Sequence, residues 1–423
     1  MLKRLSGILF FLAISLPITT QAQVWTTTER WDKDWEQRFA KFVASYRVNK
    51  DLFVGQESRY KGIRADCADA SFGIRAIFAY ENGLPFAIVN PSGSRSSTDP
   101  YRNFHNEIDR FDYISIQDQK VVEFINYIGL SVGSENLTRH NTFPLALKKV
   151  TSGDMFTYRI KARFGKYIRH VYNIKNVNPT GSYDVIYSTQ AIASKGLPMI
   201  RREQREFVNV PHTVWGFRRF RWPEYLGRSV NEIPAALGYS QEQYIIAERE
   251  GGNFFNFVSR LVRTRVETPQ AKLKRSLNSL CIEARARISY VDQGLDYLSQ
   301  IGGRCMNYQE YDAYSTPARD AALRKTFEGT KSVYREIVKD ALDNQIDPTL
   351  FGMVQTLFTS SEAYLKELKH FCPVEYAQGK SLGLAELLQR QNSGRLSSHP
   401  NDTLEHRWGE PTRISETNCK IHY

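Results

Sequence analysis

The hydrophobic periodicity of this sequence changes from strand-like to helix-like along the chain, and this change restricts the fold more than any other feature. Residues 154–160, 167–174 and 183–189 carry β-type patterns. Gly165 and the Pro179–Gly181 segment provide turns between them. The pattern predicts an antiparallel meander of strands.

Beyond residue 240 the periodicity is that of helices. The predicted helices span 253–266, 269–301, 316–344, 350–371 and 382–391. We therefore expect an α+β fold with an N-terminal domain over residues 23–198 and an all-α domain over 240–423 that ends in a polar tail. A basic and aromatic connector, residues 199–239, is expected to hold the two together. The chain has 423 residues, of which 41% are hydrophobic, so each domain can form a core.

Helices are also predicted at the start of the N-terminal domain. Apolar residues recur at helical spacing over 33–46. Asp66 can act as the N-cap of a helix that runs from Cys67 to about Tyr80, and Pro85–Val89 follows as a short buried strand. Residues 91–152 then form a loop-rich insertion with one helix near its middle.

The first 22 residues are typical of a secretory signal peptide. Lys3 and Arg4 precede an apolar run from Leu5 to Ile18, and small residues near Ala22 suit cleavage. Removing this segment lowers the formal charge from +12 to +10. We expect a periplasmic or secreted protein without a stable membrane span after cleavage. Its basic charge suits peptidoglycan or another acidic envelope polymer, and no nucleic-acid partner is expected.

Five cysteines divide unevenly between the two halves. Four of them lie beyond residue 280: Cys281, Cys305, Cys372 and Cys419. In an oxidising compartment the economical arrangement is two disulfides within the helical domain, with three pairings open. Cys67 is then left as a free thiol.

Cys67 is the candidate nucleophile because it begins a helix. Unpaired amide hydrogens and the helix dipole at that position favour a thiolate, and the same amides can stabilise an oxyanion. A nucleophilic thiol needs a base within hydrogen-bond reach. Of eight histidines, His170 alone lies on a predicted strand of the N-terminal half, so it is the candidate base.

These residues and their neighbours resemble a papain-fold cysteine hydrolase of the NlpC-type cell-wall peptidase class. Tyr60-Lys61-Gly62 followed by Asp66-Cys67 is similar to the tyrosine, glycine and Asp-Cys signature of that class. Gly153-Asp154 and His170-Val171 are similar to its Gly-Asp and His-Val strands. The related transglutaminase-like core is also similar, in the order of its Cys helix, its strand and its His strand. The insertion at 91–152 lengthens the interval between Cys and His.

The resemblance implies a papain-like N-terminal domain and acyl transfer from a thioester on Cys67, with His170 as base. Its third catalytic residue would be Tyr187 or Ser188, or Gln190 after a register slip. Tyr60, Arg64 and Asp66 are the candidate substrate-binding residues. Arg163 and Arg169 are further candidates for contacting substrate carboxylates.

Three functions fit these observations. The first is a cysteine endopeptidase or amidase acting on peptidoglycan stem peptides. The second is a transglutaminase-like enzyme that modifies proteins, and the third is a non-catalytic wall-binding or partner-binding module on a degenerate papain fold. No metal-ligand spacing or phosphate-binding glycine loop occurs, so no metal or other cofactor is expected.

Overall fold

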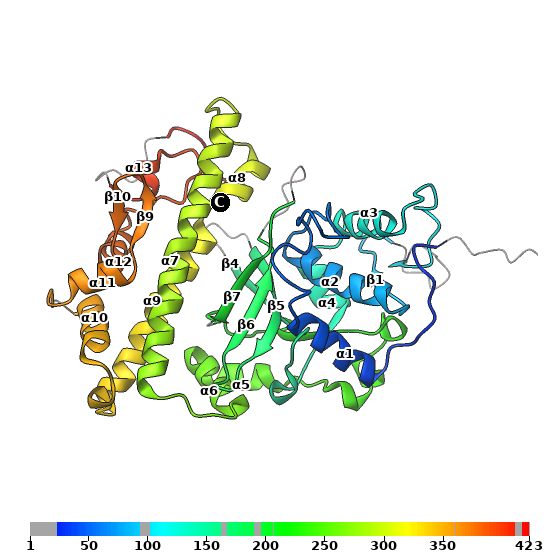
Figure 1. Cartoon of the computed structure of the whole chain (residues 1–423), viewed down its shortest axis with the longest axis horizontal. Helices are drawn as coiled ribbons and strands as arrows, with labels where there is room; N and C mark the ends of the chain where they lie inside the picture. The colour runs from blue at the N-terminus through cyan, green and yellow to red at the C-terminus, as the bar shows by residue number, and fades with distance from the viewer. Residues whose placement is uncertain are drawn as a thin grey trace, which may run out of the picture.

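A six-stranded antiparallel sheet forms the centre of the molecule. The computed structural model describes residues 23–93, 102–161, 167–189, 196–205, 207–359, 361–410 and 417–422. In spatial order its strands are β3 (Thr142–Pro144), β8 (Gly216–Phe220), β4 (Met155–Lys161), β5 (Tyr167–Val177), β6 (Tyr183–Tyr187) and β7 (Ile200–Arg205). The sheet lies between the N-terminal helices and the long helices α7 (Pro269–Gln300) and α9 (Pro317–Lys339) (Figure 1). The predicted signal peptide, residues 1–22, lies outside the described residues.

The predicted meander forms the middle of this sheet. Its three strands are β4 (Met155–Lys161), β5 (Tyr167–Val177) and β6 (Tyr183–Tyr187). β5 pairs with both neighbours, and Tyr158 lies opposite His170 in the register. The fold is therefore α+β, as the periodicity predicts.

Residues 199–239, expected to be a connector, instead supply two strands of the same sheet. These are β7 (Ile200–Arg205) and β8 (Gly216–Phe220), and β8 pairs with β4 and with the edge strand β3 (Thr142–Pro144). A basic sequence can form an interior strand here because its charges have partners. Arg219 binds Asp154 at 2.7 Å, and Arg218 donates to backbone carbonyls.

Four helices and a small hairpin lie on the N-terminal side of the sheet. The helices are α1 (Lys33–Ala44), α2 (Cys67–Glu81), α3 (Gln117–Gly129) and α4 (Ser134–His140). β1 (Ala87–Val89) pairs with β2 (Asn103–His105) outside the main sheet. The predicted insertion, residues 91–152, thus contributes β2, α3, α4 and β3.

The sheet core also includes two helices that the sequence assigned to the helical domain. These are α5 (Glu242–Glu250) and α6 (Phe254–Val262), whose buried residues Ala247, Phe254 and Val258 belong to the same core as the sheet. The second core begins at Leu273. The change of core therefore lies between α6 and α7, because the apolar side of α6 packs on the aromatic face of the sheet.

The second core is mainly helical. Its helices are α7 (Pro269–Gln300), α9 (Pro317–Lys339), α10 (Pro348–Phe358), α11 (Leu365–Phe371), α12 (Leu384–Asn392) and α13 (Leu404–Arg407). The short helix α8 (Tyr308–Tyr314) forms a separate small cluster with Met306. The expectation of an all-α domain is wrong, because β9 (Val374–Ala377) and β10 (Lys380–Leu382) form a hairpin. The predicted helix 350–371 is interrupted where Thr359 bonds the preceding turn with its side chain.

Two disulfides join distant parts of the C-terminal, mainly helical half of the chain. Cys281 pairs with Cys372 and Cys305 with Cys419, while Cys67 is free and buried. The predicted division of the cysteines is confirmed. Paired cysteines of this kind indicate a chain that folds in an oxidising, exported environment. Among the described residues, no helix combines the length and the hydrophobicity that a bilayer span requires.

Candidate active site

The N-terminus of α2 fixes the position of Cys67. The Asp66 side chain accepts hydrogen bonds from the backbone amides of Ala68 and Asp69, at 2.7 and 2.9 Å. The Asp69 carboxylate accepts from the Asp66 amide at 3.0 Å, which completes a capping box. Cys67 is therefore the first helical residue, as predicted, and its side chain is 6% exposed.

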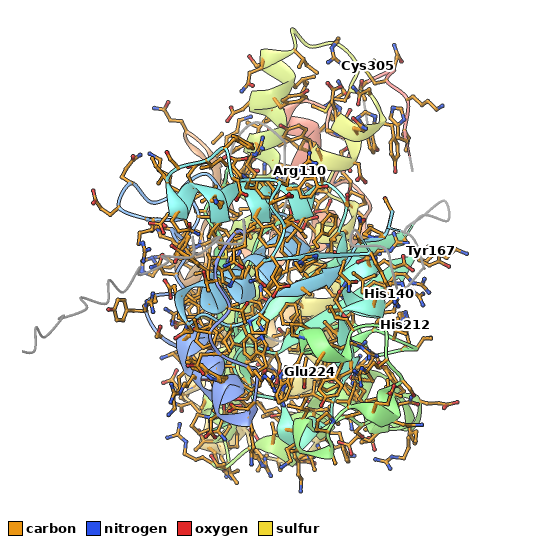
Figure 2. The ribbon with its side chains drawn as sticks, turned by 90° about the vertical axis from the view of Figure 1, so that its right-hand side faces the viewer. Arg110, His140, Tyr167, His212, Glu224 and Cys305 are labelled. Carbon is orange, nitrogen blue, oxygen red and sulfur yellow. A yellow bond between two sulfur atoms is a disulfide. The ribbon has the colours of Figure 1, made fainter. Side chains whose placement is uncertain are left out.

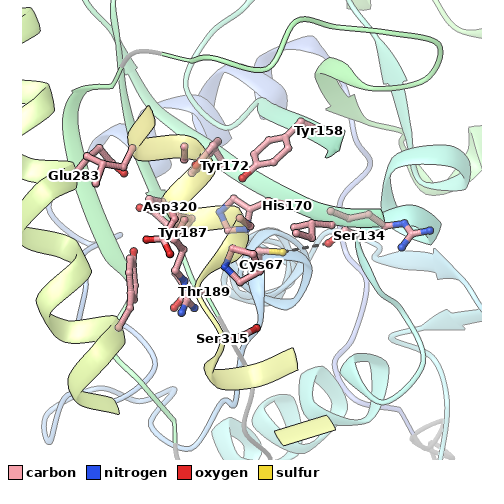
Figure 3. A pocket seen from close by; sticks show the side chains of 18 of the residues that line it. Cys67, Ser134, Tyr158, His170, Tyr172, Tyr187, Thr189, Glu283, Ser315 and Asp320 are labelled. Atoms are coloured by element: carbon pink, nitrogen blue, oxygen red, sulfur yellow. Dashed lines mark hydrogen bonds between the residues drawn. The ribbon is translucent and has the colours of Figure 1, made fainter. Parts of the chain in front are cut away.

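Strand β5 carries His170 to the same place. Cys67 and His170 line one cavity of about 420 Å³. Figure 3 shows the two side chains next to each other at its wall, with Tyr158, Tyr172 and Tyr187 around the imidazole. The sequence predicts that these two residues, about a hundred positions apart in the chain, lie together. The shared cavity is consistent with that expectation.

The cavity lies between the two cores. The N-terminal wall consists of the first residues of α2 and α4, and the sheet wall consists of β4, β5, β6 and β7. The third wall comes from α7, the end of α8 and the start of α9, with Glu283, Tyr290 and Arg319 among its residues. The helical part of the chain is therefore part of the site, which the sequence did not predict.

Tyrosine rings enclose His170. Its ring centroid lies 4.5 Å from that of Tyr172 and 5.1 Å from that of Tyr187, and Tyr158 lies at 5.7 Å. Burial is the main cause that lowers the pKa of His170 to about 3, and the positive charges of Arg319 and Arg205 lower it further. The imidazole is therefore neutral near pH 7, which is the form that accepts a proton.

Burial also controls the Cys67 thiol. It raises the pKa of Cys67, and the neighbouring Asp66 charge raises it further. A hydrogen bond with Ser134 acts in the opposite direction: the Cys67 Sγ and Ser134 Oγ atoms are 3.1 Å apart. The amide of Val171, next to His170, also favours the thiolate. The resting site thus holds a neutral thiol beside a neutral imidazole.

Ser134 is a site residue that the sequence analysis missed. It begins α4 after Gly133, so a helix-start signal was present in the sequence. That signal gives no indication that the start of α4 packs against the N-terminus of α2. Only the packing of the predicted insertion shows the contact.

The structure distinguishes between the candidates for the third catalytic residue. Tyr187 lines the cavity, whereas Ser188 does not and its buried Oγ atom has no hydrogen-bond partner among the described residues. Gln190 lies outside the described residues. Within the described ranges, His170 makes no hydrogen bond to a carboxylate or amide, so its orientation depends on the tyrosine rings and the strand.

The predicted substrate-binding residues lie in different places. Asp66 lines the cavity, but Tyr60 and Arg64 do not. The Tyr60 hydroxyl donates to Glu81 at the opposite end of α2, 2.7 Å away. Arg169 lines the cavity and forms an ion pair with Glu135 at 2.5 Å, whereas Arg163 lies outside the described residues.

The Gly-Asp pair of the sequence motif, Gly153 and Asp154, makes packing and ion-pair contacts within the fold. Gly153 has φ of +86°, and a Cβ atom there would lie 2.7 Å from the Phe39 ring. Asp154 binds Arg219 with both carboxylate oxygens. Two other histidines, His140 and His212, are exposed on the surface (Figure 2) and do not line the cavity.

No group of three or more His, Cys, Asp or Glu side chains in the described part of the chain is placed to hold a metal ion. Comparison with protein-family models found no match to this chain, and comparisons with curated proteins and with solved structures found none either.

Proposed function

We propose that this chain is an exported cysteine hydrolase that cleaves amide bonds by acyl transfer, on a papain-like arrangement of a Cys helix and an antiparallel sheet. One observation carries the proposal. The only free thiol of the chain begins a helix and lines the same cavity as a neutral histidine from the central strand of the meander. Thiol, base and concave site are the parts that this reaction needs.

The reaction proceeds in two halves. His170 takes the proton from the Cys67 sulfur as the sulfur attacks the amide carbonyl carbon, and a thioester forms when the protonated imidazole gives its proton to the leaving amine. Water, activated by the same imidazole, then attacks the thioester carbon. This step releases a carboxylate and restores the thiol. The Ala68 amide at the start of α2 is a candidate donor to the oxyanion, although it also donates to Asp66.

Peptidoglycan stem peptides are the proposed substrate. The disulfides support an exported chain, and a formal charge of +12 over the whole sequence favours an acidic envelope polymer. The cavity volume suits a short peptide segment rather than a folded protein surface. These features favour a small, anionic, amide-linked substrate over a large protein.

Purified sacculi provide the test. We expect the wild-type protein to release soluble fragments with new amino termini, and we expect Cys67→Ala and His170→Gln to release none while still folding. Mass spectrometry of the fragments locates the cleaved bond. Equal release by the wild type and Cys67→Ala would refute the proposal. Cysteine-dependent incorporation of an amine probe into proteins would favour the transglutaminase-like activity instead.

The buried thiol favours a second candidate, a non-catalytic binding module. Burial and Asp66 both raise the pKa of Cys67, whereas catalytic thiols generally have a lowered pKa. With a binding module, the wild type and Cys67→Ala would bind sacculi equally well in a sedimentation assay, and neither would release fragments. The two candidates therefore differ in one measurement on the same material.

A further inference from the structure

Four arginines line the candidate active site, and three of them have acidic partners. Arg205 lies 2.7 Å from Glu283, and Arg169 pairs with a glutamate of α4. Arg287 lies 2.8 Å from Asp320, whose carboxylate also accepts hydrogen bonds from neighbouring hydroxyls. Each of these three arginines therefore has an acidic partner within the protein, and Glu135 and Glu283 each serve more than one arginine.

Arg319 is the exception. Its guanidinium carbon lies 4.0 Å from the centre of the Tyr290 ring, and the side chain is half-buried at the cavity wall. Within the part of the chain that the structure describes, no acidic side chain forms an ion pair or hydrogen bond with it. An arginine that stacks on one face of an aromatic ring keeps its edge available for bidentate hydrogen bonds.

Helix stability does not account for a cation at this position. Arg319 is the third residue of α9, which begins at Pro317. The positive end of a helix dipole repels cations and favours acidic side chains. Asp320, the next residue, follows that preference, but Arg319 does not. The cation is therefore better explained by what it faces in the cavity.

Arg319 also lies within electrostatic reach of the reacting groups. Of all charges that act on His170, that of Arg319 lowers its pKa the most. Arg205 is second, and Glu283 offsets its charge. A ligand anion at Arg319 would thus occupy the same cavity as the imidazole and the Cys67 thiol.

We propose that Arg319 binds a carboxylate of the substrate close to the amide bond that Cys67 attacks. The inference rests on the proposed hydrolase activity and narrows its substrate to peptides with a free carboxylate near the scissile amide. The guanidinium would form two parallel hydrogen bonds with that carboxylate. Peptides whose carboxylates are amidated would lose this contact and leave the cation without a partner.

Paired peptides test the assignment. The probes are a synthetic stem peptide with free carboxylates and the same peptide with those carboxylates amidated. We expect Arg319→Gln to lower kcat/KM for the free acid roughly 10- to 100-fold, mainly through KM, and to leave the amidated peptide within about twofold. Arg319→Lys, which keeps the charge but loses the paired donors, should fall between. Arg324→Gln is the control, because Arg324 is exposed on the same helix and does not line the cavity.

Calorimetry on the Cys67→Ala background separates this inference from the hydrolase proposal. There we expect the free acid to bind and the added Arg319→Gln change to weaken binding by the same factor. If turnover depends on Cys67 but Arg319→Gln leaves it unchanged, the role of Arg319 is overturned and the hydrolase proposal is not. Arg319-dependent binding without any turnover by the wild type would overturn the hydrolase and support the carboxylate site. Equal binding of the two peptides would overturn the carboxylate site.

Discussion

The hydrogen bond between Ser134 and Cys67 gives a direct test of the candidate site. Ser134→Ala removes the hydroxyl whose Oγ atom lies 3.1 Å from the sulfur. That hydroxyl opposes the rise in thiol pKa that burial and Asp66 cause, because an O–H group that donates to sulfur stabilises the thiolate. A hydrogen bond to a charged group contributes about 1.5 to 3 kcal/mol, so its loss should raise the thiol pKa by roughly one to two units.

Alkylation by iodoacetamide measures this shift. The other four cysteines are in disulfides, so the modified thiol is Cys67. Because only the thiolate reacts, the alkylation rate below the pKa should fall about tenfold or more in Ser134→Ala. The pH dependence of the rate, followed by mass spectrometry on the folded protein, gives the pKa of both forms.

Ser71→Ala is the matched control. Ser71 is also buried and donates to the Cys67 backbone carbonyl at 3.1 Å, so it contacts the same residue without touching the sulfur. We expect its alkylation profile to match that of the wild type. The reasoning is wrong if Ser134→Ala reacts at the wild-type rate at every pH, or if Ser71→Ala is slowed to the same extent.

Three further predictions concern charge. With His170 as base, the acid limb of the pH profile of kcat/KM should lie near pH 3, far below that of an ordinary histidine. Arg319→Gln should move this limb to higher pH, and a wild-type limb near pH 6 would refute the assignment. The groups that face His170 are Cys67, Tyr158, Tyr172, Tyr187, Arg205 and Arg319. Asp320→Asn should lower the free energy of unfolding by about 3 kcal/mol in urea. Burial raises the pKa of Asp320, but Arg287 and the hydroxyls of Ser398 and Thr316 together outweigh it and hold that pKa below its ordinary value. The stabilisation is therefore lost as the pH falls through the lowered pKa, so the difference from the wild type should shrink in acid, and an equal difference there would contradict this. Lys175→Met should cost about 3 kcal/mol, because the Nζ atom donates to three backbone carbonyls at 2.7 to 2.8 Å, and a thermal unfolding midpoint equal to that of the wild type would exclude the contribution.

Local chemistry was enough to predict the elements that carry the thiol and the imidazole. The Asp66 cap marks the start of α2, and the Gly83 backbone at φ of +62° marks its end. Alternation along β5 and its neighbours defines the meander. These features depend on residues close together in the sequence, so they can be read without knowledge of the tertiary fold.

The remaining parts of the site depend on tertiary contacts. Arg218 and Arg219 made the segment around β8 resemble a connector between domains rather than a strand, because only the folded sheet supplies the carbonyls and the Asp154 carboxylate that satisfy them. Ser134 and Arg319 each lie in the first turn of a helix that could have packed against other elements. Their place in the cavity that Cys67 lines follows from tertiary packing, which no local pattern records.

The thiol pKa shows which of two opposing effects is larger at this helix start. The helix dipole favours the Cys67 thiolate by up to about 2 kcal/mol, or roughly one and a half pKa units. Full burial disfavours it by up to about 3 to 5 units, and the Asp66 charge adds to the burial effect. The effect of burial on the Cys67 pKa is therefore larger than that of the helix dipole, and the thiol is neutral near pH 7. A bound substrate carboxylate at Arg319 would offset the positive charge that, in addition to burial, lowers the pKa of His170, so the proton transfer from Cys67 becomes easier once the substrate is in place. The same cation would thereby select the substrate and make activation of the thiol depend on its presence.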